Sequence, residues 1–223
     1  MIPIIDLRGN VIAFGGRVMD DSVPKYINTS DTPVYKKSRA VFALNFAKNG
    51  NEGKLILAEG YMDVIALHQA GFTNAVAGLG TALTGEQAQL MARYAQEIIL
   101  AYDNDEAGQK ATRRAIEILG KTGVKIRVLT LRGGKDPDDI IKKHGRERFQ
   151  SLLDGAANDT EFKLSAERAK HDTDTTDGRL NYLKAAAGVL AEIDSPIEVD
   201  LYASNLASEF GVEKSAILGQ VTE

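Results

Sequence analysis

The sequence predicts an α/β protein in which a parallel β-sheet flanked by helices follows a small, basic N-terminal α+β subdomain and precedes a C-terminal helical bundle. Three observations support this fold class. Short, wholly apolar runs alternate with helical patterns over residues 51–145, which is typical of parallel strands buried on both faces. Residues 1–50 show strand and turn patterns. Residues 146–223 show only helical periodicity.

The N-terminal part should begin with a β-hairpin over residues 2–18, because apolar residues flank a Gly-Asn turn. Residues 20–37 are rich in proline and polar groups and are expected to form an ordered loop. A short helix should follow over residues 38–48, with Ser38 as its N-cap.

The central part should contain four strands, each followed by a helix or a turn. The helix after the second strand is expected to open at Thr84, because Gln87 lies at capping-box spacing from it. The expected strands are 55–58, 74–77, 97–102 and 124–130. The C-terminal part should contain helices near 146–153, 159–170, 178–193, 197–209 and 213–219.

Composition excludes several kinds of site. The chain has 223 residues, no cysteine and three scattered histidines, which excludes disulfides and thiolate zinc sites and argues against a histidine metal cluster. No apolar run approaches the roughly 20 residues that span a bilayer, and no secretory leader is recognisable, so a soluble, cytoplasmic protein is expected. The net charge of −4 conceals a basic segment, because residues 1–54 carry 8 Lys and Arg against 5 Asp and Glu.

Acidic residues or glycines follow each of the four expected strands. In an open α/β sheet, the carboxyl ends of the strands gather functional groups at one edge. Gly78 and Gly80 follow the second strand and permit close approach of a ligand to the backbone. The acids that follow the other three strands are Glu59, Asp103, Asp105, Asp136 and Asp138.

Carboxylates held this close together repel one another unless a cation neutralises them. An all-oxygen site in a chain without cysteine favours a hard ion, Mg²⁺ or Mn²⁺. The alternative for any one of these acids is a helix N-cap, as for Asp136 ahead of Pro137. Five acids at three strand ends together favour the metal site.

The basic N-terminal segment offers the complementary charge. A triphosphate or a nucleic-acid backbone needs cationic donors, because Mg²⁺ neutralises only part of its charge. Each of these residues alone could equally be a solvated surface group. The candidate donors are Arg17, Lys25, Lys36, Lys37 and Arg39, with Asn28 near them in the sequence.

These segments resemble a known family. Residues 59–64, 103–108 and 135–139 resemble the three signature segments of the Toprim domain in bacterial DnaG-type primases. Residues 9–18, 24–28 and 37–39 resemble the basic subdomain that precedes Toprim in the same enzymes. The resemblance extends from residue 1 to at least residue 145, and the C-terminal helices are compatible with the third subdomain. Three ordered segments are far more specific than a lone Asp-x-Asp pair.

The resemblance implies template-directed synthesis of short RNA primers on single-stranded DNA by two-metal nucleotidyl transfer. It assigns two or three Mg²⁺ (or Mn²⁺) ions to the acids, with the catalytic ones on Glu59, Asp103 and Asp105 and a further one on Asp136 and Asp138. It assigns contacts with the nucleoside triphosphate or the template to Arg17, Lys25, Asn28 and Lys37. Supporting roles would fall to Asp63, Gly60, Gly78 and Gly80.

Primases of this family also contain a zinc-binding domain and a helicase-binding domain. The sequence has no Cys/His zinc ligand set, so we expect a fragment or a short homologue, with zinc confined to an absent N-terminal domain. Contacts with the replicative helicase and the single-stranded-DNA-binding protein at the replication fork are expected through regions absent from this chain. No membrane partner is expected.

Other proteins with a Toprim domain remain alternatives at this stage. A metal-dependent nuclease would share the carboxylates, and a topoisomerase would need an attacking tyrosine, for which none of the seven tyrosines has a recognisable context. A non-catalytic DNA-binding module would not need an intact set of acids. A phage-type primase-helicase would need a P-loop, and that motif is absent from the sequence.

Overall fold

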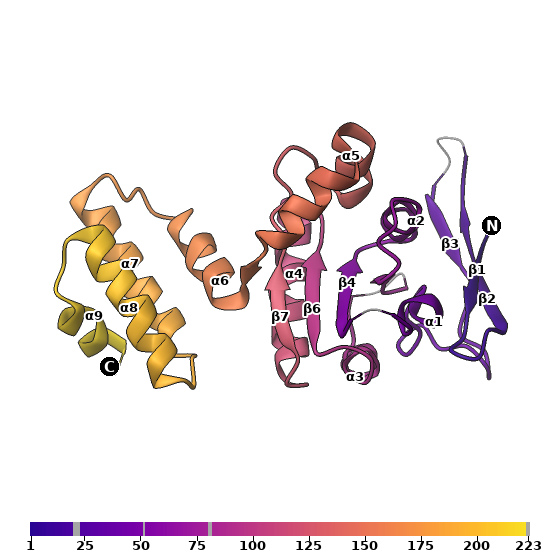
Figure 1. Ribbon diagram of the computed structural model, residues 1–223, viewed down its shortest axis with the longest axis horizontal. Coiled ribbons are helices and arrows are strands. Elements are labelled where there is room, and N and C mark those ends of the chain that lie inside the picture. The colour runs from indigo at the N-terminus through magenta and orange to yellow at the C-terminus, as the bar shows by residue number, and fades with distance from the viewer. Residues whose placement is uncertain (20–22, 51, 80–81, 222–223) are drawn as a thin grey trace. The chain divides into compact units, whose positions relative to one another are not determined.

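The computed structural model describes residues 1–19, 23–50, 52–79 and 82–221 (Figure 1). The chain divides into two compact units, residues 1–156 and residues 157–223. Within the described residues, no helix is long and apolar enough to cross a membrane. The first unit contains an antiparallel and a parallel sheet, and the second is helical apart from a short strand, so the expected fold class is confirmed.

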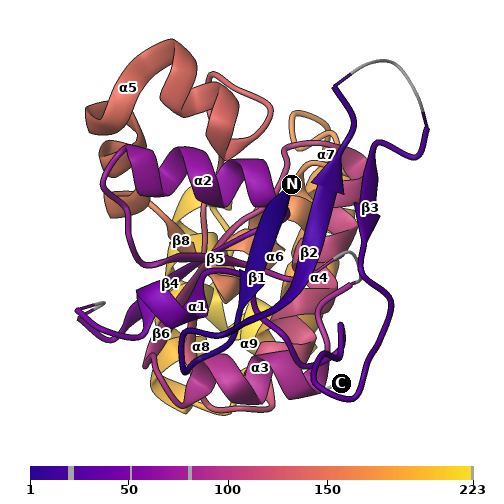
Figure 2. The ribbon, with the colours of Figure 1, turned by 90° about the vertical axis from the view of Figure 1, so that its right-hand side faces the viewer.

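The N-terminal sheet is antiparallel and has the order β1-β2-β3 (Figure 2). Strands β1 (Ile2–Ile5) and β2 (Val11–Arg17) form the predicted hairpin. The carboxylate of Asp6 closes its turn by accepting hydrogen bonds from two backbone N–H groups of the turn. Strand β3 (Tyr26–Asn28) lies where the sequence predicted a loop, because three residues are too few to show an alternating pattern.

The predicted start of the helix over residues 38–48 is wrong. Helix α1 covers only Leu44–Ala47, and Ala43 precedes it in the left-handed conformation at φ 63°. The backbone of Phe42 exchanges hydrogen bonds with Ala77 at the edge of the parallel sheet, with N···O distances of 2.8 and 3.3 Å. Ser38 therefore lies in a hydrogen-bonded turn and caps no helix.

The parallel sheet of the first unit has the strand order β5-β4-β6-β7, and the four predicted strands are all present. Their bounds are β4 (Lys54–Ala58), β5 (Ala75–Ala77), β6 (Glu97–Ala101) and β7 (Lys125–Val128). β5 and β6 are buried at every residue and β4 at all but Lys54, which accounts for the apolar runs that follow Lys54 in β4 and Glu97 in β6.

Four helices flank this sheet: α2 (Tyr61–Gln69), α3 (Gly85–Ala92), α4 (Glu106–Gly120) and α5 (Pro137–Asp154). α2 and α5 pack with the strands in one core cluster, and α3 and α4 lie on the other face (Figure 2). Thr84 and Gln87 form the predicted capping box at the start of α3. The helix predicted near 146–153 is the second half of α5, which begins nine residues earlier at Pro137. Gly145, at φ 77°, interrupts the helical pattern and hid the first half.

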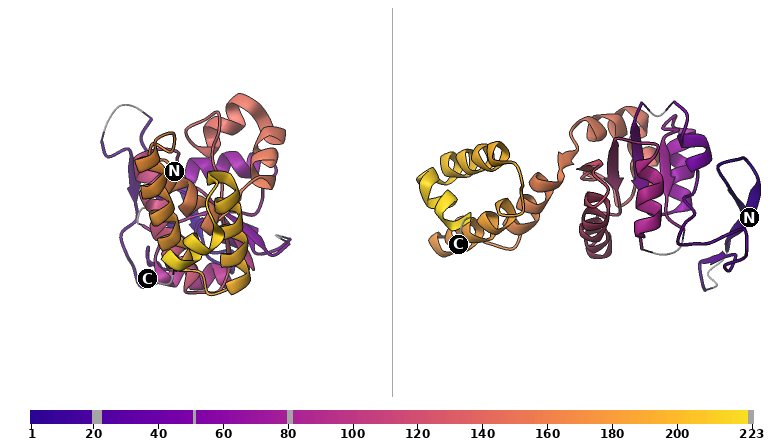
Figure 3. Two further views of the ribbon diagram at one scale, coloured as in Figure 1. Left: turned by 90° about the vertical axis from the view of Figure 1, so that its left-hand side faces the viewer. Right: turned by 90° about the horizontal axis from the view of Figure 1, so that it is seen from below.

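As far as the structure describes it, to residue 221, the second unit consists of β8 (Ala157–Asn158) and four helices (Figure 3). The predicted positions of these helices agree with those observed. The helices are α6 (Asp159–Arg168), α7 (Thr176–Leu190), α8 (Pro196–Phe210) and α9 (Lys214–Val221). Apolar side chains from all four form one core, which includes Leu164, Tyr182, Leu190 and Leu206. The predicted C-terminal bundle is therefore confirmed.

Gln87 connects the N-terminal segment to α3 and offers a test of this packing. Its fully buried amide group donates to the carbonyl oxygens of Lys37 and Ala40 at 3.0 and 2.9 Å. Gln87→Leu should lower the free energy of unfolding by about 2–4 kcal/mol, because two carbonyls lose their donor inside the protein. Urea denaturation measures this.

The exposed Gln89 on the same helix provides the control. Gln89→Leu should change the free energy of unfolding by less than about 0.5 kcal/mol. Equal effects of the two substitutions would show that the buried hydrogen bonds of Gln87 do not stabilise the fold.

Candidate active site

Glu59 and Asp103 follow neighbouring strands and are joined by a hydrogen bond. Ala58 at the end of β4 pairs with Ala101 at the end of β6 in the parallel ladder. Oε1 of Glu59 accepts a hydrogen bond of 2.9 Å from the backbone N–H of Asp103. Two acids from separate strand ends therefore lie side by side, as the sequence predicted.

Asp105 is the N-cap of α4. Its Oδ1 accepts a hydrogen bond of 2.7 Å from the backbone N–H of Gly108. The capping role considered for the strand-end acids is thus real for this residue. The side chain nevertheless remains exposed, and Oδ2 and further lone pairs are free of this bond, so capping leaves Asp105 able to bind a cation.

Gly108 allows α4 to approach the end of β6 closely. A Cβ atom at this position would lie 2.0 Å from the carbonyl oxygen of Asp103 and 3.0 Å from Oε1 of Glu59. Every residue other than glycine would therefore displace the two acids. Gly108 was not among the site residues predicted from the sequence. Its signal was a glycine in the first turn of a helix, where glycine costs stability unless a close approach requires it.

A second group of acids lies at the start of α5. Asp136 is the N-cap of α5 and accepts a hydrogen bond of 2.7 Å from the backbone N–H of Asp139. The backbone N–H of Asp138 donates to Oδ1 of Asp63 on α2 at 3.5 Å. Asp63 also repels both Asp103 and Asp136 electrostatically, so it lies between the two groups of acids.

Lysines neutralise the acids of α5 but not those that follow β4 and β6. The ion pairs at the start of α5 are Lys135–Asp136, Lys142–Asp138 and Lys143–Asp139. Over the part of the chain that the structure describes, no lysine or arginine forms an ion pair with Glu59, Asp103 or Asp105. The charge of these three acids is therefore left for an external cation to balance.

Burial and mutual repulsion raise the pKa values of Glu59, Asp63 and Asp103. Burial raises the pKa of Asp103 to about 7, and repulsion from Glu59 and other nearby carboxylates adds to the shift. Burial and repulsion from Asp136 raise the pKa of Asp63 to about 6. The pKa of Glu59 also rises through partial desolvation, although the hydrogen bond from Asp103 opposes the rise. Clustered carboxylates with raised pKa values are typical of functional sites.

The chemistry of this edge fits a divalent cation with oxygen ligands, because Glu59, Asp103 and Asp105 have no ion-pair partner in the part of the chain that the structure describes. Among the described residues, no three acidic or histidine side chains converge closely enough to make a preformed metal site. The acids therefore surround the site without closing into a ligand cage. A cation bound among them would draw the carboxylates together and relieve their repulsion.

Two cavities adjoin the acids. One of about 620 Å³ is lined by Asp103, Asp105 and the lysines at the start of α5. The other, of about 430 Å³, is lined by Glu59 and includes Gly78, which follows β5 as predicted. Gly60 precedes α2 in an extended conformation, and Gly80 lies outside the described residues.

Arg17 and Asn28 share the face of the N-terminal sheet that looks toward α2 and α5. Gly15 pairs with Asn28 and Arg17 pairs with Tyr26, and alternate residues of a strand share one face. Asn28 contacts α2 through a hydrogen bond from Tyr61. The guanidinium of Arg17 lies close enough to Lys142 of α5 to repel it. These two predicted phosphate-binding residues therefore lie on the side of the acids.

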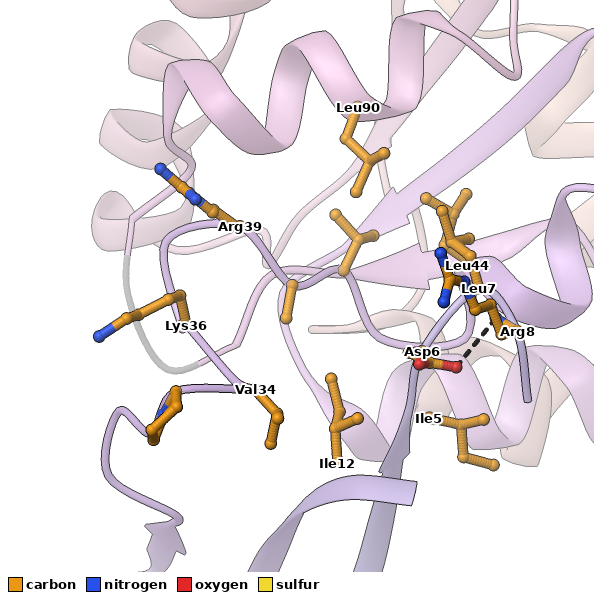
Figure 4. Close-up of a pocket in the computed structure, with 13 residues that line it drawn as sticks. Ile5, Asp6, Leu7, Arg8, Ile12, Val34, Lys36, Arg39, Leu44 and Leu90 are labelled. Atoms are coloured by element: carbon orange, nitrogen blue, oxygen red, sulfur yellow. Dashed lines mark hydrogen bonds between the residues drawn. The ribbon is translucent and has the colours of Figure 1, made fainter. Parts of the chain in front are cut away.

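The backbone carbonyl groups of Lys25 and Lys37 accept hydrogen bonds from other parts of the chain. The carbonyl of Lys25 accepts from Val18, and that of Lys37 accepts from Gln87. Their neighbours Lys36 and Arg39 form ion pairs with Asp31 and Glu86, which leaves them less available to a ligand. Figure 4 shows that Lys36 and Arg39 line a third cavity, of about 390 Å³, together with apolar residues such as Val34 and Leu90.

The family models that match the chain follow its architecture. The model of the N-terminal domain of the DNA primase catalytic core matches residues 1–48, and a Toprim-like model matches residues 56–141. A model described as the DnaB-helicase binding domain of primase matches residues 160–215. The sequence had led us to expect helicase contacts only through regions absent from this chain, whereas this model matches residues within the second unit.

The solved structure of the DnaG catalytic core is 33% identical to the chain, with a TM-score of 0.75, and the match covers 96% of this chain and 71% of that one. The chain belongs to the DnaG-type bacterial primase family. The RNA polymerase domain of Mycobacterium tuberculosis DnaG in complex with double-stranded DNA is 33% identical with a TM-score of 0.83, over 95% of this chain and 70% of that one. Membership of this family and its Toprim domain imply binding of a divalent metal.

The curated relatives are much longer than this DnaG-type chain. The DNA primase of Clostridium acetobutylicum is 40% identical over 97% of this chain and 36% of its own length. That of Deinococcus radiodurans is 37% identical over 100% of this chain and 40% of its own length. The chain therefore spans well under half of the curated primases that it matches.

The raised pKa of Asp103 predicts how stability depends on pH. The unfolded chain has an Asp pKa near 3.9, so between about pH 4 and pH 7 the folded protein binds more protons at this group. The free energy of unfolding of the metal-free protein should therefore fall as the pH rises through this range. Asp103→Asn removes the ionisation and should flatten the profile and stabilise the protein at pH 8. Urea denaturation in EDTA at pH 5 and pH 8 measures both effects.

Glu117→Gln is the matched control, because Glu117 is exposed on α4. Its stability profile should run parallel to that of the wild type. A wild-type profile that Asp103→Asn leaves unchanged would show that Asp103 does not carry the proton assigned to it.

Proposed function

We propose that this chain is the RNA polymerase core of a primase and that it synthesises short RNA primers on a single-stranded DNA template. The observation that carries the proposal is that Glu59 and Asp103 meet at adjacent strand ends and that, among the described residues, neither forms an ion pair with a lysine or arginine. Its relatives support the same function. A related DnaG primase catalytic domain was solved with single-stranded DNA bound, at 33% identity and a TM-score of 0.76.

Glu59, Asp103 and Asp105 would hold the catalytic Mg²⁺ or Mn²⁺ ions, and Asp136 and Asp138 would hold a further one. Such ions activate the attacking hydroxyl and neutralise the triphosphate during transfer. The chain itself supplies the placement. The hydrogen bond from Asp103 fixes the carboxylate of Glu59, and the close approach at Gly108 fixes the Asp103 backbone.

Arg17, Lys25, Asn28 and Lys37 would bind the phosphates of the incoming nucleotide or the template. The position of Arg17 and Asn28 on the face toward α2 and α5 supports this role for these two residues. Charge-assisted hydrogen bonds from such donors hold the nucleotide in the orientation needed for attack. Asp63 accepts a hydrogen bond from the backbone N–H at the start of α5 and would keep the two groups of acids at a fixed distance from each other.

The match to a helicase-binding model supports a proposal for the partner. We place contact with the replicative helicase in residues 160–215. We expect contact with the single-stranded-DNA-binding protein to involve other parts of a full-length primase. We also expect this chain to act at the replication fork.

Asp103→Ala should abolish primer synthesis. Removal of a ligand that stabilises the transition state by several kcal/mol should lower the rate by about a hundredfold or more. Labelled ribonucleotides on a single-stranded DNA template with Mg²⁺ measure the activity. Glu117→Ala, on the exposed side of α4, is the control and should retain it.

The same assay separates synthesis from cleavage. Retained synthesis in a folded Asp103→Ala protein would refute the assignment. Shortening of labelled DNA in Mn²⁺ without synthesis would show that the acids serve a nuclease instead.

Arg17→Ala should weaken nucleotide or template binding more than it slows turnover. Loss of one charge-assisted hydrogen bond should raise the KM about tenfold. Arg113→Ala provides a matched loss of charge on the exposed side of α4 and should leave the KM unchanged. Equal KM values for the Arg17 and Arg113 variants would exclude Arg17 from the binding site.

A further inference from the structure

Tyr61 joins the segment that carries Glu59 to the N-terminal sheet. It is the first residue of α2 and follows Glu59 by two positions. Its side chain is 6% exposed, and its hydroxyl donates a hydrogen bond of 2.8 Å to Oδ1 of Asn28 on β3. The two residues are 33 positions apart in the sequence, and neither motif in which they occur predicts this contact.

The ring of Tyr61 is fixed by a close fit on several sides. A Cβ atom at Gly15, which pairs with Asn28 across the sheet, would lie 2.8 Å from the Cζ and hydroxyl oxygen of Tyr61. Phe42 packs edge-on against the ring at a centroid distance of 4.9 Å, and Tyr26 lies at 6.1 Å. The hydroxyl is therefore held in one place, and Gly15 provides the space for it.

The hydrogen bond determines what Asn28 can offer a ligand. An asparagine amide has one oxygen that accepts and one nitrogen that donates twice. Because the oxygen is engaged by Tyr61, the NH₂ group is directed away from it, and within the described residues it donates to no other group. Phosphate oxygens and template oxygens accept hydrogen bonds, so only the NH₂ group can bind them. An amide turned over by 180° would present its oxygen and repel a polyanion.

Tyr61 also supports the neighbouring cation. Tyr26 packs against Tyr61, and the guanidinium carbon of Arg17 lies 5.8 Å from the centroid of the Tyr26 ring. Cation–π contact of this kind restricts the guanidinium group. One side chain thus orients Asn28 directly and backs the ring on which Arg17 rests.

We propose that Tyr61 is a positioning residue for substrate binding, which holds the Asn28 amide with its NH₂ group toward the phosphate or template oxygens. The inference rests on the proposed function, because it assumes that Asn28 binds the substrate. It adds a role for the tyrosine that follows Glu59-Gly60, and it explains why glycine occupies position 15.

Tyr61→Phe tests the proposal, because it removes the hydroxyl and keeps the ring. The expected result is a KM for the nucleoside triphosphate raised about five- to tenfold, with kcat within about twofold of the wild type. Tyr35→Phe is the matched control. Tyr35 belongs to the same core cluster and is 1% exposed, and its hydroxyl has no hydrogen-bond partner among the described residues. This variant should change neither parameter. For Tyr61→Phe, an unchanged KM for the nucleoside triphosphate together with an unchanged affinity for the single-stranded template would overturn the proposal.

Asn28 variants separate failure of this inference from failure of the proposed function. Asn28→Asp can still accept from Tyr61 but has no donor for the ligand, so it should raise the KM at least as much as Tyr61→Phe. In an Asn28→Ala background, Tyr61→Phe should have no further effect on the KM. If both Asn28 variants bind the nucleotide and template normally, the proposed role of Asn28 fails, and the inference falls with it. If the Asn28 variants weaken binding and Tyr61→Phe does not, or if its effect adds fully to that of Asn28→Ala, the inference alone is overturned.

Discussion

The geometry of the candidate site depends on the parallel pairing of β4 with β6. This pairing aligns Ala58 with Ala101, so the residues that follow both strands emerge at the same edge. The hydrogen bond from the Asp103 backbone to Glu59 then holds one carboxylate against the other strand's end. Carboxylates at this spacing repel one another, and this repulsion adds to burial in raising the pKa values of Asp103 and Asp63. The fold overcomes this repulsion by burying the strands that carry the acids.

The distribution of lysines divides the acids into two classes. Those at the start of α5 each have a lysine partner within the same loop or one helical turn away. Those that follow β4 and β6 have none among the described residues. Because the lysines of these pairs are exposed, the pairs contribute little stability, and a lysine can leave its carboxylate when a stronger cation arrives. The α5 acids can therefore exchange partners, whereas the acids that follow β4 and β6 depend on a cation from outside the chain.

The sequence predicted the strand ends because parallel strands buried on both faces are continuous apolar runs, and the acids directly follow them. It could not predict features that depend on contacts between distant segments. The start of α1 failed because Phe42 pairs with the edge strand instead of extending the helix. The first half of α5 was not among the predicted helices, because Gly145 resembles a helix boundary, although Asp136 ahead of Pro137 had been considered as an N-cap. Gly108 and Tyr61 were part of recognised motifs, but the atoms that they approach belong to other elements, and no spacing rule indicates them.

The link between Glu59 and Tyr61 restricts how the two halves of the candidate site can move. Two residues of chain span at most about 7 Å, so the acid edge and the hydroxyl that engages Asn28 are carried by one short segment. That segment lies between a buried strand and the first turn of α2, neither of which deforms easily. A shift of the end of β4 would therefore move Tyr61 and, through it, the NH₂ group of Asn28. A substrate that reaches from the metal-binding acids to the N-terminal sheet would then meet the acids and the NH₂ group of Asn28 at a fixed separation. The distance between the acids and Asn28 would therefore help to determine which substrates fit.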